Sequence, residues 1–480
     1  MSDKGTVSRR SILKAGVVAA GAIGCQRAWC AEVVDATPWI QKVGDHEYYL
    51  IPFDELSRER PWGKIKPTLS SQQAAKELAS QPITDVFMFS HGWQGDMDAA
   101  YLQYERWVTA MAACTADIAK MQQVRPGFRP LLIGVHWPSL PFGDEELRDA
   151  ASAIAVVDSR IDKYAKRIGD TPASRAALHT ILAASEAEQP DRLSPQLIHA
   201  FRTLQGNARH SLRSVGRWQG VEDEGFDPQR LYAEMQAVPS FDAQTNGFAG
   251  NLILELLRAT SFWKMKDRAR QFGESGGHHL LASLQAAVPR DRTVRFHLMG
   301  HSFGCIVMSA TLAGPPGATS SVRPVDSLSL VQGALSLWGY CSSIPAQPRT
   351  AGYFRPILER RLVRGAIITT QSQHDTAVGR YYPLAAGVAR QVAYAREDQP
   401  VLPKYGGVGT YGINGLGCDP QAVEILAPNA DYRFLPGKIY NIECSRVIAT
   451  MADKFSGAHS DICHPEVAHA IWEAAMVKSR

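Results

Sequence analysis

Residues 293–305 constrain the fold of this chain more than any other stretch, because an apolar run ends there in a sharp glycine-bounded motif. The run Thr-Val-Arg-Phe-His-Leu-Met is followed by Gly-His-Ser-Phe-Gly at 300–304. A run of about seven mainly apolar residues predicts a buried strand, and Gly-x-Ser-x-Gly is the strand-to-helix turn that presents a nucleophilic serine. Glycines two residues before and after the serine leave room for strand and helix to approach closely. The small apolar residues 305–313 predict that helix.

One such motif can arise by chance in a chain with 39 glycines among 480 residues, so its surroundings decide its meaning. Apolar runs typical of buried strands lie at 47–56, 82–90, 131–137, 325–333, 365–371 and 438–444. Amphipathic helical periodicity marks 97–121, 252–272 and 465–478. Apolar strands that alternate with helices predict a doubly wound, mostly parallel α/β sheet. Pro52 places the first strand at the edge of that sheet, since proline cannot donate to a strand ladder.

The segment 143–251 departs from this alternation. It is rich in Ala, Arg, Glu and Asp, shows helical periodicity and contains no convincing strand. We therefore expect a helical insertion that caps the carboxyl edge of the sheet, with a core built from 32–142 and 252–480. The alternative is an independent helical domain used for assembly. The glycine-dense residues 405–417 lack the ending of a phosphate loop and are interpreted as a surface loop, with a place at the site as the second option.

Residues 1–31 have the pattern of an export signal. Arg9 and Arg10 are followed by Ser-Ile-Leu-Lys, by the apolar run 15–25, which is too short to span a bilayer, and by small residues. The paired arginines resemble the twin-arginine signal, which implies export of the folded protein by the twin-arginine machinery to the periplasm or beyond, with no permanent membrane span. The alternatives are an ordinary basic leader or a disordered tail, and a lipid anchor on Cys25.

The net charge of the chain is concentrated in that leader. Of 51 basic and 47 acidic residues, five bases and one acid precede Ala31, which leaves 46 of each in the body. A neutral body provides no field that would recruit nucleic acid. Six cysteines lie beyond the leader without a Cys-x-x-Cys pair, so zinc and redox roles lack support. We expect most of them to be buried thiols, with Cys418 and Cys463 as one pair that could form a disulfide.

An acid and a histidine at later strand ends provide the groups that a nucleophilic serine needs. A serine hydroxyl becomes a good nucleophile when a base accepts its proton and a third group orients that base. Asp375 follows the predicted strand 365–371, and His459 lies in a short polar loop between the last strand and the last helix. In the chain order serine, acid, histidine, we expect Ser302 as the nucleophile, Asp375 as the acid and His459 as the base.

Each of these assignments has a competitor. His374 could be the functional group, with the acid next to it acting as a turn cap. Asp326 is a weaker candidate for the acid, because it stands near the start of its strand. His464 and His469 compete with His459, although the first would cap the last helix and the second lies within it.

Acyl transfer also places negative charge on a carbonyl oxygen, which calls for preorganised hydrogen-bond donors. The backbone N–H of Phe303 is one donor by position, and the second is expected from the loop after an earlier strand. The sequence Ser-His-Gly-Trp occupies that loop, so Trp93 is the expected second donor and Gly92 the alternate. The competing interpretation is a tight turn without a catalytic role. His91 and His301, which precede the glycine and the serine, are candidate substrate-binding residues.

Together these motifs resemble the α/β-hydrolase family of serine hydrolases at 82–137 and 252–480. Ser-His-Gly-Trp, Gly-His-Ser-Phe-Gly and Ala-His-Ser-Asp-Ile are similar to the oxyanion, nucleophile and base segments of its esterase- and lipase-like members. The resemblance implies an α/β-hydrolase fold, hydrolysis through an acyl-enzyme, and neither a metal nor an organic cofactor. The long insertion departs from the family pattern and leaves the substrate class open.

We therefore expect an exported serine hydrolase that cleaves a carboxylic ester of a small molecule or a lipid-like compound, with an amide as the less favoured substrate. The competing interpretation comes from a different class of protein. It is a catalytically silent scaffold of the same fold, whose insertion binds a protein or an envelope component.

Overall fold

The computed structural model describes residues 40–63, 67–93, 97–139, 161–162, 164–165, 168–187, 189–213, 227–236, 252–260, 262–317, 322–378, 393–394, 402–403, 406–452 and 457–478. The export signal expected at 1–31, with Cys25, lies outside these ranges. Among the helices within them, none combines the length and the hydropathy that crossing a membrane requires.

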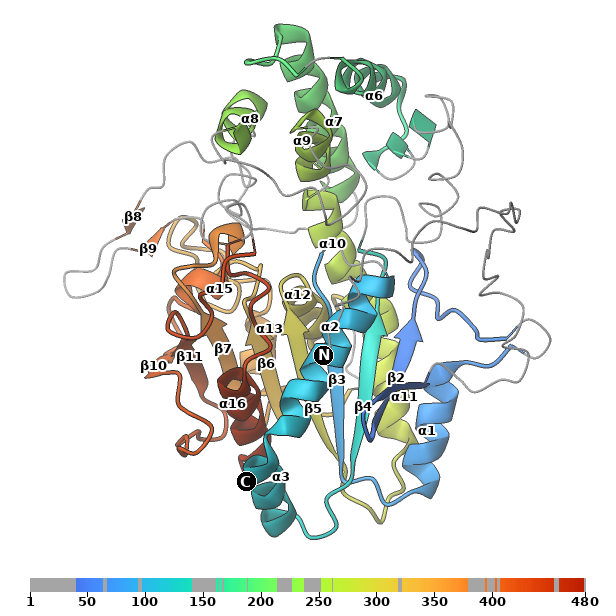
Figure 1. Ribbon diagram of the computed structural model, residues 1–480, viewed down its shortest axis with the longest axis vertical. Coiled ribbons are helices and arrows are strands. Elements are labelled where there is room, and N and C mark those ends of the chain that lie inside the picture. Colours follow the sequence, from blue (N-terminus) through green and yellow to red (C-terminus); the bar gives the residue numbers. More distant parts are fainter. Residues whose placement is uncertain are drawn as a thin grey trace, which may run out of the picture.

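A nine-stranded sheet forms the centre of the molecule (Figure 1). Its spatial order is β1-β2-β4-β3-β5-β6-β7-β11-β10, and all neighbours are parallel except the β1–β2 pair at one edge. The expected α/β class with a mostly parallel sheet is confirmed. The strands are β1 Ile40–Val43, β2 His46–Pro52, β3 Asp85–Ser90, β4 Pro130–His136, β5 Arg295–His301, β6 Ser327–Val331, β7 Ile367–Gln371, β10 Gln421–Glu424 and β11 Ile439–Glu443. A separate ladder joins β8 Ala393–Tyr394 to β9 Leu402–Pro403.

Helices cover both faces of the sheet (Figure 1). Alternate strand residues explain this, since Val86 and Met88 of β3 belong to one apolar cluster and Phe87 and Phe89 to the other. The first cluster is covered by α1 Ser70–Ser80, α10 Phe262–Phe272, the π-helix η1 Gly273–Gly277, α11 His278–Ala287, α12 Gly304–Ala313 and α13 Arg355–Glu359. The second is covered by α2 Met97–Ala113, α3 Thr115–Val124 and α16 Pro465–Met476.

A helical cluster lies beyond the carboxyl edge of the sheet, where a cap was expected (Figure 1). It has an apolar core of its own, which includes Leu178, Phe201, Tyr232 and Leu256. Its members are α6 Pro172–Ser185, α7 Pro195–Arg213, α8 Pro228–Gln236 and α9 Leu252–Thr260. The pattern at 252–272 predicts one helix of the core, but α9 packs within the helical cluster and only α10 packs on the core.

Two expectations about the sheet were wrong. The strand that ends in Pro52 is not an edge strand, because β1 pairs with its outer side. Pro52 is the last residue of β2, a position where a missing N–H costs little. The short strands β1 and β10 were not predicted; each has four residues at an edge of the sheet, and β1 is mostly half-buried while β10 is mostly exposed.

The glycine-dense stretch 405–417 is not a surface loop. Its helix α15, Val408–Tyr411, begins with the fully buried Val408, and Ile413 is fully buried as well. Glycine is needed here because the chain packs closely, since a Cβ on Gly407 would lie 2.1 Å from Cγ1 of Val378.

Two smaller expectations also failed. The helix expected at 97–121 is divided into α2 and α3 at Cys114. All six cysteines beyond the leader are free thiols, so Cys418 and Cys463 are not bonded to each other.

A buried polar cluster joins the elements at the amino edge of the sheet. Asp85, the first residue of β3, accepts a hydrogen bond from Nε2 of His297 at 3.0 Å and another from the guanidinium of Arg125. Arg125 also donates to the carbonyl of Ala475 at the end of α16, and Nδ1 of His297 contacts Oγ of Ser327 at 2.9 Å. Burial disfavours the ionised carboxylate, but the bond from His297 and the charge of Arg125 outweigh it and lower the pKa of Asp85.

We expect Asp85→Ala to lower the free energy of unfolding by about 3–5 kcal/mol, because Arg125 would keep its buried charge without a carboxylate partner. Urea denaturation at neutral pH measures the effect. Glu47→Ala is the matched control, since it removes an exposed partner of Lys42 and should cost less than about 1 kcal/mol. Equal losses in the two variants would contradict a structural role for the amino-edge cluster.

Candidate active site

Ser302 occupies a strained corner between β5 and α12, at the carboxyl edge of the sheet. Its φ is 57°, in the left-handed region that residues with a side chain rarely adopt. Hydrogen bonds to both the N–H and the carbonyl of Ser302 hold this conformation. The N–H of Ser302 donates to the carbonyl of Val331 at 3.2 Å, and its own carbonyl accepts from the N–H groups of Ala334 at 3.2 Å and Cys305 at 3.1 Å. The corner is therefore set by main-chain bonds to the neighbouring strand end.

The glycines around Ser302 are required by the contacts they make. A Cβ on Gly300 would lie 2.4 Å from the carbonyl carbon of Gly304, and a Cβ on Gly304 would lie 2.2 Å from the carbonyl oxygen of Ser90. A Cβ on Gly92 would lie 2.7 Å from Cβ and 3.2 Å from Oγ of Ser302. The loop after β3, expected to supply an oxyanion donor, thus passes directly against the serine.

Asp375 and His459 form a hydrogen-bonded pair at the same edge. Asp375 follows β7 and is 1% exposed, and its Oδ2 lies 2.8 Å from Nδ1 of His459. A carboxylate only accepts, so Nδ1 carries the proton and Nε2 is the nitrogen that can take one from a nucleophile. The other carboxylate oxygen, Oδ1, accepts the N–H of Val378 at 2.9 Å.

The loop that carries His459 is fastened to the acid turn and to the serine corner. The N–H of Ala458 donates to the carbonyl of His374 at 2.9 Å, and Nε2 of His301 donates to the carbonyl of His459 at 2.9 Å. The rings of His301 and His459 lie 4.9 Å apart, centroid to centroid. Ser302 and His459, both described, make no hydrogen bond with each other, and contacts of this kind commonly tighten when substrate binds. The residue before the serine therefore holds the expected base beside it.

Three of the four competing residues, Asp326, His464 and His469, lie elsewhere or make other bonds. Asp326 stands at the amino edge, where its Oδ2 accepts the N–H of Phe296 at 2.9 Å. His464 pairs with Asp461 at 2.8 Å, and His469 belongs to a separate cluster on α16. The structure thus brings Ser302, Asp375 and His459 to one edge, and their catalytic roles stay predictions.

His91 orients the loop that faces the serine. It is 1% exposed, with Nδ1 2.9 Å from the carbonyl of Gly92 and Nε2 2.9 Å from Nδ1 of His136. Burial and the neighbouring His136 lower the pKa of His91 well below its ordinary value, so the ring is neutral with its proton on Nδ1. The bond fixes the direction of the Gly92 carbonyl. In a planar trans peptide it also fixes the N–H of Trp93, which points the opposite way.

Of the two expected substrate-binding histidines, His301 has the unused ring nitrogen. Burial and the neighbouring His459 lower the pKa of His301 to about 3, so its ring is neutral. Its Nε2 donates to the His459 carbonyl, while its Nδ1 is buried without a hydrogen-bond partner among the described residues. Both nitrogens of His91 already contact protein groups. Substrate contact by either residue stays a prediction.

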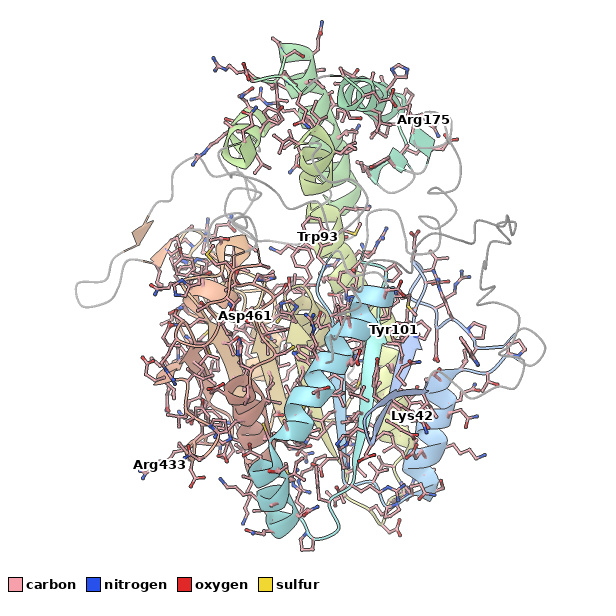
Figure 2. All side chains as sticks on the ribbon, viewed as in Figure 1. Lys42, Trp93, Tyr101, Arg175, Arg433 and Asp461 are labelled. Carbon is pink, nitrogen blue, oxygen red and sulfur yellow. The ribbon has the colours of Figure 1, made fainter. Side chains whose placement is uncertain are left out.

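Two aromatic rings stack on each other in the segments that meet at the serine. Trp93 and Phe303 stack with centroids 5.7 Å apart and an interplanar angle of 26°. Figure 2 places Trp93 between the sheet and the helical cluster. Phe303 is the N-cap of α12, so its N–H belongs to the positive end of that helix. The expected donors Phe303 and Trp93 therefore come from neighbouring segments.

The amino-edge cluster contains a second Ser–His–Asp set, formed by Ser327, His297 and Asp85. These residues are 1%, 1% and 0% exposed. A substrate cannot reach a serine that is closed off in this way. Residue types and hydrogen bonds alone therefore do not identify an active site, whereas Ser302 differs in its place at the carboxyl edge of the sheet, where it is 7% exposed.

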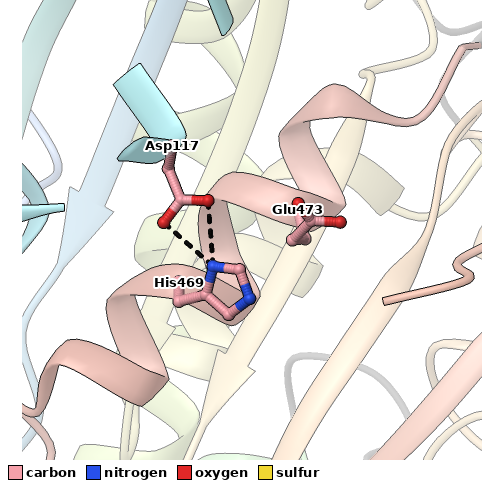
Figure 3. Close-up of side chains that lie close together, drawn as sticks. All are labelled: Asp117, His469 and Glu473. Carbon is pink, nitrogen blue, oxygen red and sulfur yellow. Dashed lines mark hydrogen bonds and ion pairs between the residues drawn. The ribbon is translucent and has the colours of Figure 1, made fainter. Parts of the chain in front are cut away.

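One group of described residues has the chemistry of metal ligands: Asp117, His469 and Glu473 (Figure 3). Nδ1 of His469 lies 2.9 Å from both oxygens of Asp117, and its Nε2 donates to the carbonyl of Ala430 at 2.6 Å. Lys120 already neutralises Glu473 at 2.5 Å and also contacts Asp431. With both ring nitrogens bonded to acceptors and an ammonium on the second carboxylate, the group is a buried ion-pair network that joins α16 to α3.

The sequence analysis missed one residue that contacts the acid. Nε2 of Gln332 donates to Oδ2 of Asp375 at 3.0 Å, from the position directly after β6. The sequence contained a signal for this residue, because Gln332 is a polar residue near the carboxyl end of the predicted strand 325–333, which follows the Gly-x-Ser-x-Gly motif.

Comparisons of the chain with protein-family models, with curated proteins and with solved structures find no match.

We expect Gly92→Ala to slow the reaction of Ser302 with a fluorophosphonate reagent by about 10²–10³-fold, because the added methyl group displaces the serine or the loop that faces it. The rate of covalent labelling measures the effect. Gly206→Ala on α7 is the control, since its added methyl group meets nothing within 4 Å. That change should leave labelling unchanged and raise helix stability by up to about 1 kcal/mol. Labelling of Gly92→Ala at the wild-type rate would contradict the close contact.

We expect His469 to make the protein less stable as pH rises. Burial lowers the pKa of His469, but the bonds to Asp117 and Ala430 outweigh burial and the net shift is upward. Such a group contributes stability that is complete below its unfolded pKa of about 6.5 and is lost as pH rises through the folded pKa. Glu473 and Lys120 are the other charged groups that lie near this pair.

His469→Gln tests this dependence. The difference in free energy of unfolding between wild type and variant should be largest near about pH 6 and should shrink toward about pH 9. The control His179→Gln, on the exposed face of α6, should show no such trend. A difference that stays constant with pH would exclude the charged pair.

Proposed function

We propose that this protein is a serine hydrolase with an α/β-hydrolase fold, which cleaves a carboxylic ester through an acyl-enzyme. The observation that carries the proposal is the 2.8 Å bond between Asp375 and His459, whose carbonyl accepts a hydrogen bond from the residue before a serine held at a φ of 57°. The chain order of serine, acid and histidine, placed after β5, β7 and β11, supports the α/β-hydrolase fold. The motif at Arg9 and Arg10 supports export of the folded enzyme.

In the proposed reaction, Oγ of Ser302 attacks the carbonyl carbon of the ester while Nε2 of His459 takes its proton. Asp375 keeps the other proton on Nδ1 and stabilises the imidazolium that forms. The imidazolium then protonates the departing alcohol, and the acyl group stays on the serine as an ester. Water deacylates the serine by the same route, which returns the proton to the serine oxygen.

Negative charge on the carbonyl oxygen needs donors that are already in place. We assign the backbone N–H groups of Phe303 and Trp93 to this role, and removal of one such donor typically costs 10²–10³ in rate. The bond from His91 to the Gly92 carbonyl supports the assignment, because it fixes the peptide that carries the second donor. The geometry is therefore prepared before substrate arrives.

The half-buried ring of Trp93, in the loop that faces the serine, supports a substrate with an apolar acyl group. Apolar surface beside the nucleophile favours such a group without the need for a charged partner. The helical cluster above this edge would enclose the remainder of the substrate (Figure 1).

Labelling with a fluorophosphonate tests the proposal. We expect stoichiometric labelling of wild type, none of Ser302→Ala, and labelling at least about 10²-fold slower in His459→Ala, because the base is lost. His464→Ala should keep most of the rate, since that ring pairs with Asp461 and not with Asp375. Ser327→Ala should label like wild type, because the serine at the amino edge is closed off.

Two results would overturn parts of this proposal. Folded wild-type protein that does not label would favour the catalytically silent scaffold. Equal losses in His459→Ala and His464→Ala would remove the assignment of the base. Hydrolysis of p-nitrophenyl esters of increasing acyl length then reports the substrate class.

A further inference from the structure

We propose that Gln332 is a positioning residue that fixes the carboxylate of Asp375 against His459. The inference rests on the proposed function, because that function gives Asp375 and His459 their roles. Gln332 follows β6, which lies between β5 and β7, the strands that lead to the serine and to the acid. It is fully buried, and its Nε2 lies 3.0 Å from Oδ2 of Asp375.

The surroundings of the Gln332 amide fix its orientation. Its Nε2 faces two groups that only accept hydrogen bonds, Oδ2 of Asp375 and, at 3.2 Å, the carbonyl of Gly409. Its Oε1 accepts the hydroxyl of Thr370 at 2.9 Å, and the same hydroxyl oxygen accepts the backbone N–H of Gln332 at 2.9 Å. A flipped amide would place its oxygen against two acceptors, so only one orientation is consistent with these contacts.

These bonds hold the carboxylate plane from separate directions. Oδ2 of Asp375 accepts both Nδ1–H of His459 and Nε2–H of Gln332, while Oδ1 accepts the N–H of Val378. A carboxylate held only by the histidine could rotate about its last torsion, since that torsion has a broad energy minimum. The amide of Gln332 removes this freedom and keeps one oxygen directed at the imidazole.

The backbone of Gln332 is strained, as is that of Ser302. Its φ is 43°, a left-handed value that costs a residue with a side chain about 1–3 kcal/mol. Such a conformation persists where surrounding contacts determine it. The bond from its N–H to Thr370 and the bonds of its amide supply those contacts. Strained residues at two adjacent strand ends thus both serve the same edge.

The pH dependence of Gln332→Glu tests the inference. When the introduced carboxyl is protonated it can still donate to Oδ2 of Asp375, whereas once ionised it meets that carboxylate with like charge. We expect the ratio of variant to wild-type kcat/KM for p-nitrophenyl butyrate to fall at least about tenfold between about pH 5 and about pH 8. Gln332→Leu should lower kcat by about 10–100-fold at every pH, with KM changed by less than about threefold.

Two threonines of β7 provide matched controls. Thr370→Val removes the hydroxyl that holds the amide of Gln332, so kcat should fall by about 3–10-fold. Because no charge is introduced, this loss should not grow as pH rises. Thr369→Val changes the adjacent residue, whose hydroxyl is buried without a partner among the described residues, and should behave as wild type. A merely structural role for Gln332 would lower the thermal midpoint without changing the shape of the pH profile.

An active wild type together with a wild-type pH profile in Gln332→Glu would overturn this inference alone. An inactive, unlabelled wild type would instead overturn the proposed function. In that case the low-field NMR resonance of the proton between His459 and Asp375 decides the positioning role. The inference predicts that this resonance shifts in Gln332→Leu and not in Thr369→Val, and no shift in either variant would contradict it.

Discussion

The carboxyl edge of this sheet depends on three stretches of main chain that meet with no side chain between them. The strand before Ser302, the helix after it and the loop that follows β3 approach so closely that a Cβ on Gly300, Gly304 or Gly92 would overlap its neighbour. Main-chain contact of this kind is stiff, because peptide units have few soft torsions. The serine therefore owes its position to backbone geometry and not to the choice of a side-chain rotamer. Van der Waals overlap, more than any single hydrogen bond, excludes other arrangements of this corner.

The same device appears where the acid turn meets the loop of His459. Gly457 has a φ of 59°, and a Cβ there would lie 2.3 Å from the carbonyl oxygen of His374. Hydrogen bonds from Ala458 and His301 then tie this loop to both of its neighbours. Three side chains that are far apart in sequence are thereby placed by contacts between the main chains that carry them. Side-chain hydrogen bonds, such as the one from Gln332 to Asp375, add to these main-chain contacts.

The parts of this structure that were predictable are those with a local chemical pattern. Long apolar runs predicted the central strands, and the glycine spacing around Ser302 predicted the turn between strand and helix. Both structures depend on residues that are neighbours in sequence. The short edge strands carry no such pattern, since the exposed residues 421–424 bury little apolar surface. The glycine-dense stretch that contains Gly409 was assigned to the surface because buried close packing and exposed turns both select glycine. The polar residue Gln332 at the end of a predicted strand was a signal, but its contacts with Asp375 and Thr370 could not be predicted, because only the folded chain brings these residues together.

The helical cluster has a consequence for how this chain can change over evolutionary time. The helical cluster has an apolar core of its own. Strand β4 before the insertion and strand β5 after it both pair with β3. Substitutions, lengthening or replacement of the cluster would leave the register of those strands and the corner at Ser302 intact. The chain thus consists of a sheet module, which holds the candidate site, and a helical module with a core of its own. Exchange of the second module would not require the first to be rebuilt.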